Sequence, residues 1–127
     1  LEERLEKIYD FLQNLIAEHK PDEVSVESLF FSTNPKTAFD VGAARGVILL
    51  AAKKAHLPIF QYTPLQVKSS LTGYGKAEKT QVQFMVTKIL RLKEIPKPDD
   101  AADALALAVC HAHSSGSAIA SIYRNHK

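Results

Sequence analysis

The chain has 127 residues, of which 46% are hydrophobic and 24% are charged, a composition typical of one soluble globular domain. Its longest apolar run covers residues 47–52 and ends at Lys53, well short of the roughly 20 residues that a membrane-spanning helix needs. The one cysteine, Cys110, excludes an internal disulfide and favours a cytoplasmic location.

The small net charge of +2 conceals an uneven distribution of charge along the chain. Residues 1–40 carry four basic and nine acidic side chains, residues 41–97 carry ten and two, and residues 98–127 carry two and three. A basic middle between acidic ends suits a phosphate-binding surface beside a group of carboxylates. Charged, solvated faces without any partner give similar sums, so the distribution alone leaves both interpretations open.

The first half of the chain predicts a helix, a strand and a second helix. Apolar residues recur every three or four positions up to about His19, and residues 23–31 form a short β-branched stretch that predicts a strand. Asn34 is the expected N-cap of a helix that continues to about residue 55. Small residues follow one another at four-residue intervals in that helix, so another backbone could approach closely there: Ala38, Gly42 and Gly46.

The second half predicts a strand followed by three helices. Four segments carry these elements: 58–62 as the strand, then 65–71, 78–92 and a helix capped by Asp99 or Asp100 that runs to about 113. Two strands joined by a helix make a parallel pair, and parallel sheets normally have more strands than two. Because the chain also starts at Leu1, within a helical pattern, we expect a domain over residues 1–113 that lacks its first strands, followed by a polar tail over 114–127.

Three carboxylates are candidates for metal binding or catalysis. Glu27 stands near the end of the first predicted strand, where α/β proteins place their ligands. Asp100 and Asp103 share a face of the last predicted helix; capping alone would explain one of them. The apolar residues around Asp103 predict a buried helix, in which a carboxylate needs a compensating cation.

The glycine-rich turn at residues 73–75 is surrounded by basic side chains. It lacks the spacing of a nucleotide-binding phosphate loop, which we therefore exclude. Lys68, Lys76 and Lys79 could bind nucleic-acid phosphates, or they could form an ordinary solvated surface. The spacing of residues 110–113, Cys-His-Ala-His, disfavours a zinc site.

Together the segments resemble the RuvC family of Holliday-junction resolvases, which have an α/β, RNase H-like fold with a mostly parallel sheet flanked by helices. The resemblance rests on five motifs that occur in the family's order: ESLFF (27–31) with Asn34, GAARGV (42–47), YTPLQVK (62–68), GYGKAEKTQVQ (73–83) and DDAADALA (99–106). It implies a homodimeric, Mg-dependent endodeoxyribonuclease with two ions per site. Such an enzyme binds four-way junction DNA and makes paired symmetric nicks in recombination and repair.

The same resemblance implies roles for individual residues. Glu27, Asp100 and Asp103 match three of the family's four acidic metal ligands and catalytic residues, and the fourth, an aspartate on its first strand, has no counterpart here. The family's DNA-binding positions are matched by Lys68, Lys79, Phe30 and, with less support, Lys76.

Two further expectations accompany these roles. The branch-migration proteins RuvA and RuvB are implied partners. Because one of the four acidic ligands has no counterpart, a catalytically inactive junction-binding or nucleic-acid-binding module on the same fold is the alternative function.

Overall fold

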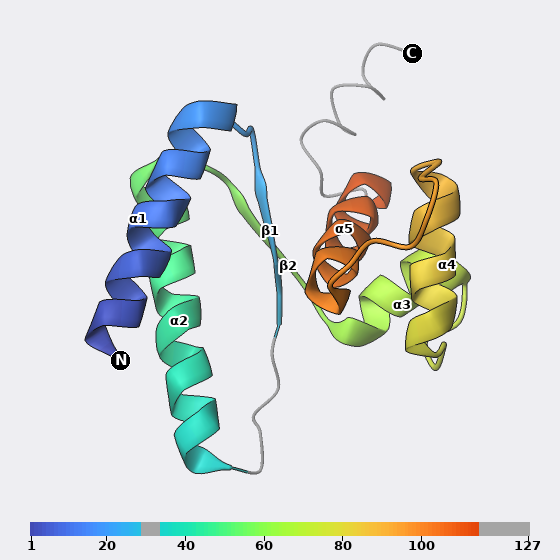
Figure 1. Ribbon diagram of the computed structural model, residues 1–127, viewed down its shortest axis with the longest axis horizontal. Coiled ribbons are helices and arrows are strands. Elements are labelled where there is room, and N and C mark those ends of the chain that lie inside the picture. Colours follow the sequence, from blue (N-terminus) through green and yellow to red (C-terminus); the bar gives the residue numbers. More distant parts are fainter. Residues whose placement is uncertain (29–33, 115–127) are drawn as a thin grey trace. The chain divides into compact units, whose positions relative to one another are not determined.

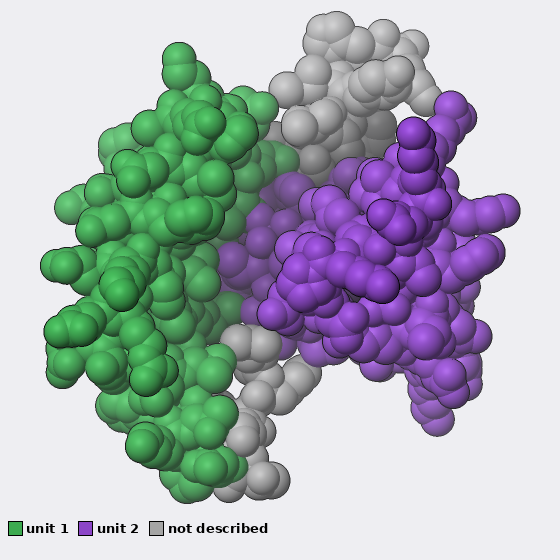
Figure 2. Space-filling view, in the orientation of Figure 1, with its two compact units in different colours: residues 1–24, 30–59 green, residues 25–29, 60–127 purple. Residues whose placement is uncertain are grey.

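The computed structural model describes residues 1–28 and 34–114, and the fold below concerns those residues. The elements run in the order α1 (Glu2–His19), β1 (Val24–Glu27), α2 (Pro35–Lys54), β2 (Ile59–Tyr62), α3 (Pro64–Thr72), α4 (Lys79–Ile89) and α5 (Asp99–His113), as Figure 1 shows. They form two compact units, which Figure 2 colours separately: the described residues of 1–24 with 30–59, and the described residues of 25–29 with 60–127. No helix in the described part of the chain is both long and apolar enough to span a membrane.

The two strands pair in parallel, as the helical connection between them predicts. The backbone N–H of Val24 donates to the carbonyl of Pro58 at 2.9 Å, and that of Ser28 donates to Tyr62 at 2.7 Å. Both strands therefore end at the same edge, and Glu27 is the last residue of β1. The part of the predicted strand beyond Ser28 lies outside the described residues, as does Phe30.

In the first unit, α1 packs against α2. The side-chain oxygen of Asn34 accepts hydrogen bonds from the N–H groups of Lys36 and Thr37 at 3.0 and 3.4 Å, so Asn34 is the N-cap that the sequence predicts. A Cβ added at Gly42 or Gly46 would meet nothing within 4 Å. The predicted close approach of another backbone to this face therefore does not occur within the described chain.

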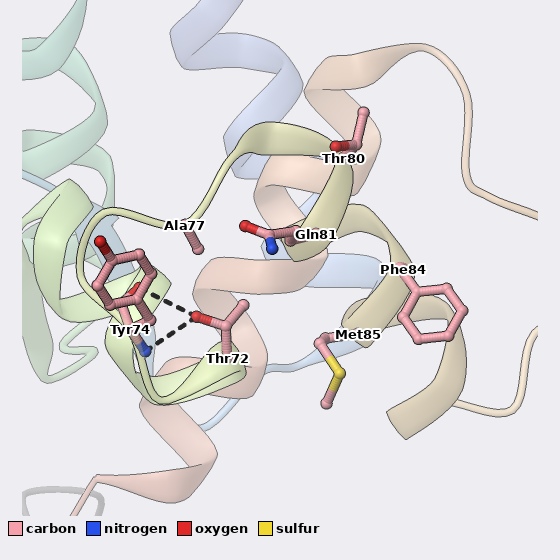
Figure 3. Close-up of a pocket in the computed structure, with 7 residues that line it drawn as sticks. All are labelled: Thr72, Tyr74, Ala77, Thr80, Gln81, Phe84 and Met85. Atoms are coloured by element: carbon pink, nitrogen blue, oxygen red, sulfur yellow. Dashed lines mark hydrogen bonds between the residues drawn. The ribbon is translucent and has the colours of Figure 1, made fainter.

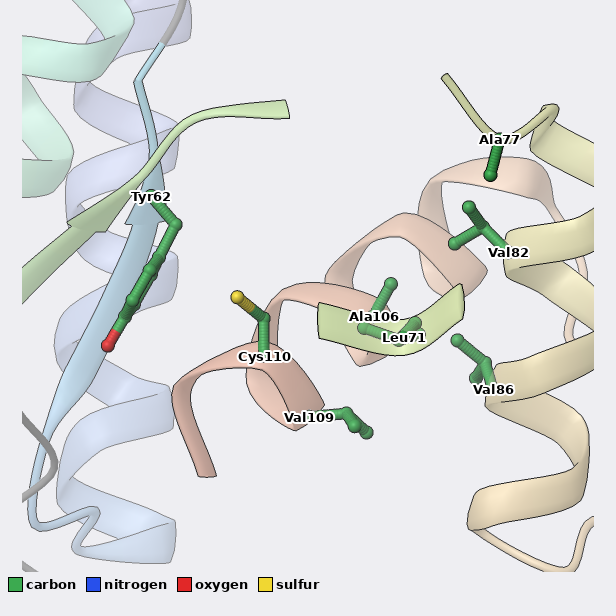
Figure 4. Packing of buried hydrophobic residues seen from close by; sticks show 8 residues of the cluster. All are labelled: Tyr62, Leu71, Ala77, Val82, Val86, Ala106, Val109 and Cys110. Carbon is green, nitrogen blue, oxygen red and sulfur yellow. The ribbon is translucent and has the colours of Figure 1, made fainter. Parts of the chain in front are cut away.

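The second unit is built from α3, α4 and α5, each of which packs against the other two. Its core is an apolar cluster to which β2 and all three helices contribute, drawn in Figure 4: Tyr62, Leu71, Ala77, Val82, Val86, Ala106, Val109 and Cys110. Val86 has no exposed surface at all. Burial also raises the pKa of the Cys110 thiol, so this residue remains a neutral member of the core.

Local signals set both ends of α3 in the second unit. The Thr63 side chain accepts from the N–H of Gln66, which begins α3, and Gly73 ends it with a φ of 77°, a left-handed conformation that favours glycine. α4 ends at Ile89, before the predicted residue 92, and Arg91 then has a φ of 54°. The N-cap of α5 is Pro98, so the predicted capping by Asp99 or Asp100 is wrong; both lie inside the first turn.

We expect Val86→Ala to lower the free energy of unfolding by about 2 kcal/mol, because it removes two methyl groups from a fully enclosed position. Val41→Ala is the matched control: Val41 lies on α2 and is 40% exposed, so its loss should cost well under about 1 kcal/mol. Urea denaturation of the intact gene product would measure both. Equal losses would contradict the placement of Val86 in the core.

Candidate active site

One strand and three helices, β1, α3, α4 and α5, line a cavity of about 230 Å³ at the end of β1. Its apolar lining comes from Pro64, Val67, Val82 and Ala106. Its polar lining consists of two carboxylates, Glu27 and Asp103, and two ammonium groups, Lys68 and Lys79. The cavity thus brings groups of both charges together among apolar side chains. Carboxylates can hold a divalent cation and ammonium groups can hold a phosphate, so the lining suits a metal-assisted reaction on a phosphate.

Each polar group lies at, or within one turn of, an end of its helix or strand, and these ends meet at the cavity. Glu27 closes β1, and Lys68 lies one turn into α3. Lys79 is the first residue of α4, whose start is fixed by the hydrogen bond from the N–H of Glu78 to Gln81 Oε1 at 2.8 Å. Asp103 lies one turn into α5.

Lys79 forms ion pairs with two carboxylates of α5. Its Nζ lies 3.6 Å from Asp99 Oδ2 and 3.6 Å from Asp103 Oδ2. The negative charge of Asp103, followed by that of Asp99, raises the pKa of Lys79, which keeps the ammonium charged. Because Lys79 and Asp103 are each 54% exposed, water screens these pairs and leaves them easy to separate.

The structure brings together only some of the predicted site residues. Glu27, Lys68, Lys79 and Asp103 line one cavity, whereas Asp100 is exposed in the first turn of α5 and does not line it. Lys76 is exposed in the turn before α4. Across residues 1–28 and 34–114, no three acidic, histidine or cysteine side chains lie close enough together to hold a metal ion.

Asp103 is more exposed than its apolar neighbours suggested. The sequence predicts a buried carboxylate, but the side chain is 54% exposed. Ala102 and Ala106 occupy the buried face of α5 at 1% exposure each, and Asp103 lies beside that face. Asp103 is therefore accessible to a cation or to a substrate from outside.

The histidines of α5 contribute to packing. His111 Nδ1 shares a hydrogen bond with the Tyr62 hydroxyl, and its ring lies 4.6 Å from that of Phe60. His113 Nδ1 lies 3.2 Å from Ser70 Oγ. These contacts hold α5 against β2 and α3, which the spacing of the histidines alone could not predict.

A second and larger cavity, of about 390 Å³, lies between the glycine-rich turn and α4 (Figure 3). It is lined by Thr72, Tyr74, Ala77, Thr80, Gln81, Phe84 and Met85. The Thr72 hydroxyl accepts from the Tyr74 N–H at 3.1 Å and donates to the Tyr74 carbonyl at 3.0 Å. Since no carboxylate, lysine or arginine lines it, we assign the chemistry to the smaller cavity.

Residues 1–111 match the sequence model of a protein family described as crossover junction endodeoxyribonuclease RuvC. The chain belongs to the RuvC family. RuvC of Natranaerobius thermophilus is 60% identical to it over 111 residues, which are 87% of this chain and 69% of that protein. RuvC of Brevibacillus brevis is 58% identical over 109 residues, 86% of this chain and 66% of that protein.

Solved RuvC structures agree with this membership. Thermus thermophilus RuvC is 42% identical and superposes with a TM-score of 0.81; the same protein in complex with a Holliday junction substrate gives 0.84. In both cases the match covers 88% of this chain and 68% of the other. The RNase H-like fold that the motifs predict is thereby confirmed, and the chain spans about two thirds of the length of its RuvC relatives.

Proposed function

We propose that the protein carrying this chain is a structure-selective endodeoxyribonuclease that binds four-way (Holliday) junctions and makes paired symmetric nicks in recombination and repair. Membership in the RuvC family supports this function, and so does the Holliday junction substrate bound to the Thermus thermophilus relative. The observation that carries the proposal is the cavity in which Glu27 and Asp103 lie with Lys68 and Lys79.

The carboxylates of this cavity are the proposed ligands of magnesium, two ions per site, with Asp100 as a third contributor. Their donor chemistry fits, because Mg²⁺ prefers carboxylate oxygens, and Asp103 already attracts a cation in the form of Lys79. Bound magnesium would activate water and stabilise the leaving oxygen of a phosphodiester. Glu27 and Asp103 would supply negative charge from two elements, β1 and α5.

Lys68 and Lys79 are the proposed contacts to the DNA backbone beside the cut bond. Both line the cavity that holds the carboxylates, so a phosphate placed there would lie within reach of an ammonium group. Lys76 is proposed as a further backbone contact outside the cavity. Phe30 is proposed as an aromatic contact to the junction, on the strength of the ESLFF motif.

We further propose a homodimer, with RuvA and RuvB as partners, in the cytoplasm. The small-residue face of α2 supports the dimer, because nothing in the described chain lies within 4 Å of a Cβ added at Gly42 or Gly46. A two-fold assembly suits a nearly symmetric four-way junction. The single cysteine, Cys110, is a buried free thiol, which supports a location in a reducing compartment.

A synthetic four-way junction with labelled arms tests the proposed function. Incubated with the intact gene product and MgCl₂, the junction should give two nicks at symmetric positions, and linear duplex of the same sequence should stay uncut. A retarded but uncut junction would support the inactive binding module instead. Absence of both binding and cutting would contradict the proposal.

A further inference from the structure

Asp99 joins two side chains of α4 to the start of α5. Its Oδ2 lies 3.6 Å from Lys79 Nζ, and its Oδ1 accepts a hydrogen bond from Gln83 Nε2 at 3.3 Å. Lys79 and Gln83 are four residues apart on α4, and Asp99 and Asp103 are four apart on α5, so each pair shares one helix face. The four side chains form a ladder between the two helices.

The two carboxylates in this ladder differ in their surroundings. Asp103 lines the cavity together with Glu27, whereas Asp99 is not among the residues that line it. Asp99 contacts two side chains of α4, one through each carboxylate oxygen. Asp103 forms an ion pair with Lys79. Lys79 thus lies between a carboxylate that lines the cavity and one outside it, Asp99, which a hydrogen bond joins to Gln83.

We propose that Asp99 is a positioning residue: it keeps the Lys79 ammonium beside the cavity when a divalent cation binds Asp103. This rests on the proposed function. A cation at Asp103 repels the ammonium, and at 3.6 Å Asp99 offers it a second counter-charge without a change of helix position. Without Asp99, the ammonium of Lys79 keeps Asp103 as its counter-charge and competes there with the cation.

A double-mutant cycle on cation binding isolates this role from a general effect of charge. The probe is MnCl₂ alone, without DNA, and the measurement is the electron paramagnetic resonance signal of free Mn²⁺ in solutions of the intact gene product. Asp99→Asn should weaken Mn²⁺ binding about threefold when Lys79 is present, the size expected for an exposed ion pair. In the Lys79→Gln background the same substitution should change binding less than about 1.5-fold.

Glu94→Gln is the matched control, because it removes one negative charge from the segment between α4 and α5 and leaves the ladder intact. Its small effect should be the same in both backgrounds. If Asp99→Asn weakens Mn²⁺ binding equally with and without Lys79, Asp99 acts as a simple charge or as a ligand, and the proposal fails. If the unsubstituted protein cuts junctions but the effects of Asp99→Asn and Lys79→Gln on Mn²⁺ binding are additive, this inference alone is overturned. If the unsubstituted protein neither binds Mn²⁺ nor cuts junctions, the proposed function is overturned too.

Discussion

Asp103→Asn is expected to reduce junction cutting at least about 100-fold while leaving junction affinity within about twofold. The substitution keeps the size of the side chain and removes the charge that a cation would need. Since Asp103 is 54% exposed, the new amide is hydrated and the fold should be unaffected. Lys79 retains Asp99 as a counter-charge, so the basic side of the cavity stays in place. Cutting is measured at saturating protein, and affinity by gel retardation without magnesium.

Asp10→Asn provides the control for this experiment. The substitution makes the same chemical change at an exposed position of α1, in the first unit. It should alter neither the cutting rate nor the affinity for the junction. Undiminished cutting by Asp103→Asn would show that Asp103 is not a metal ligand. A parallel loss of affinity would instead indicate that its role is in binding the junction.

The sequence predicted every helix and strand in the described part of the chain, and it placed their ends best where local signals are strong. Asn34 and Thr63 are hydrogen-bonding N-caps, and each is followed by a proline that suits the first helical position. The end of α4 and the start of α5 were predicted less well. There Arg91 adopts a positive φ and Pro98 takes the place of an aspartate as the N-cap, and neither residue type is one that usually marks such a position.

The candidate site was predicted residue by residue from motifs, but its geometry was not. The motifs supplied Glu27, Lys68, Lys79 and Asp103, which line one cavity. The pairing of Lys79 with Asp99 requires α4 to pack on α5, a tertiary contact that no sequence spacing encodes. The sequence predicted Asp99 only as a possible cap of α5, and its four-residue separation from Asp103 is the one signal that would have linked it to the site.

Lys68→Gln and Lys76→Gln are expected to separate catalysis from binding. Lys68 lines the cavity with Glu27, so its loss should lower the cutting rate of bound junction about 100-fold, comparable to the removal of one charge-stabilising donor from an active site. Lys76 is exposed in the turn before α4 and lines no part of the cavity. Its loss should therefore weaken junction binding several-fold and leave the cutting rate at saturation unchanged.

The salt dependence of binding provides a second measurement on the same two variants. Each lysine that contacts a phosphate releases about one counterion, so either substitution should reduce the slope of log affinity against log salt by about one. The cutting rate at saturation then distinguishes the two residues, because only Lys68 shares the cavity with the carboxylates. Equal losses of cutting rate in both variants would mean that the basic turn reaches the cut bond, and the cavity at the end of β1 would no longer define the whole active site.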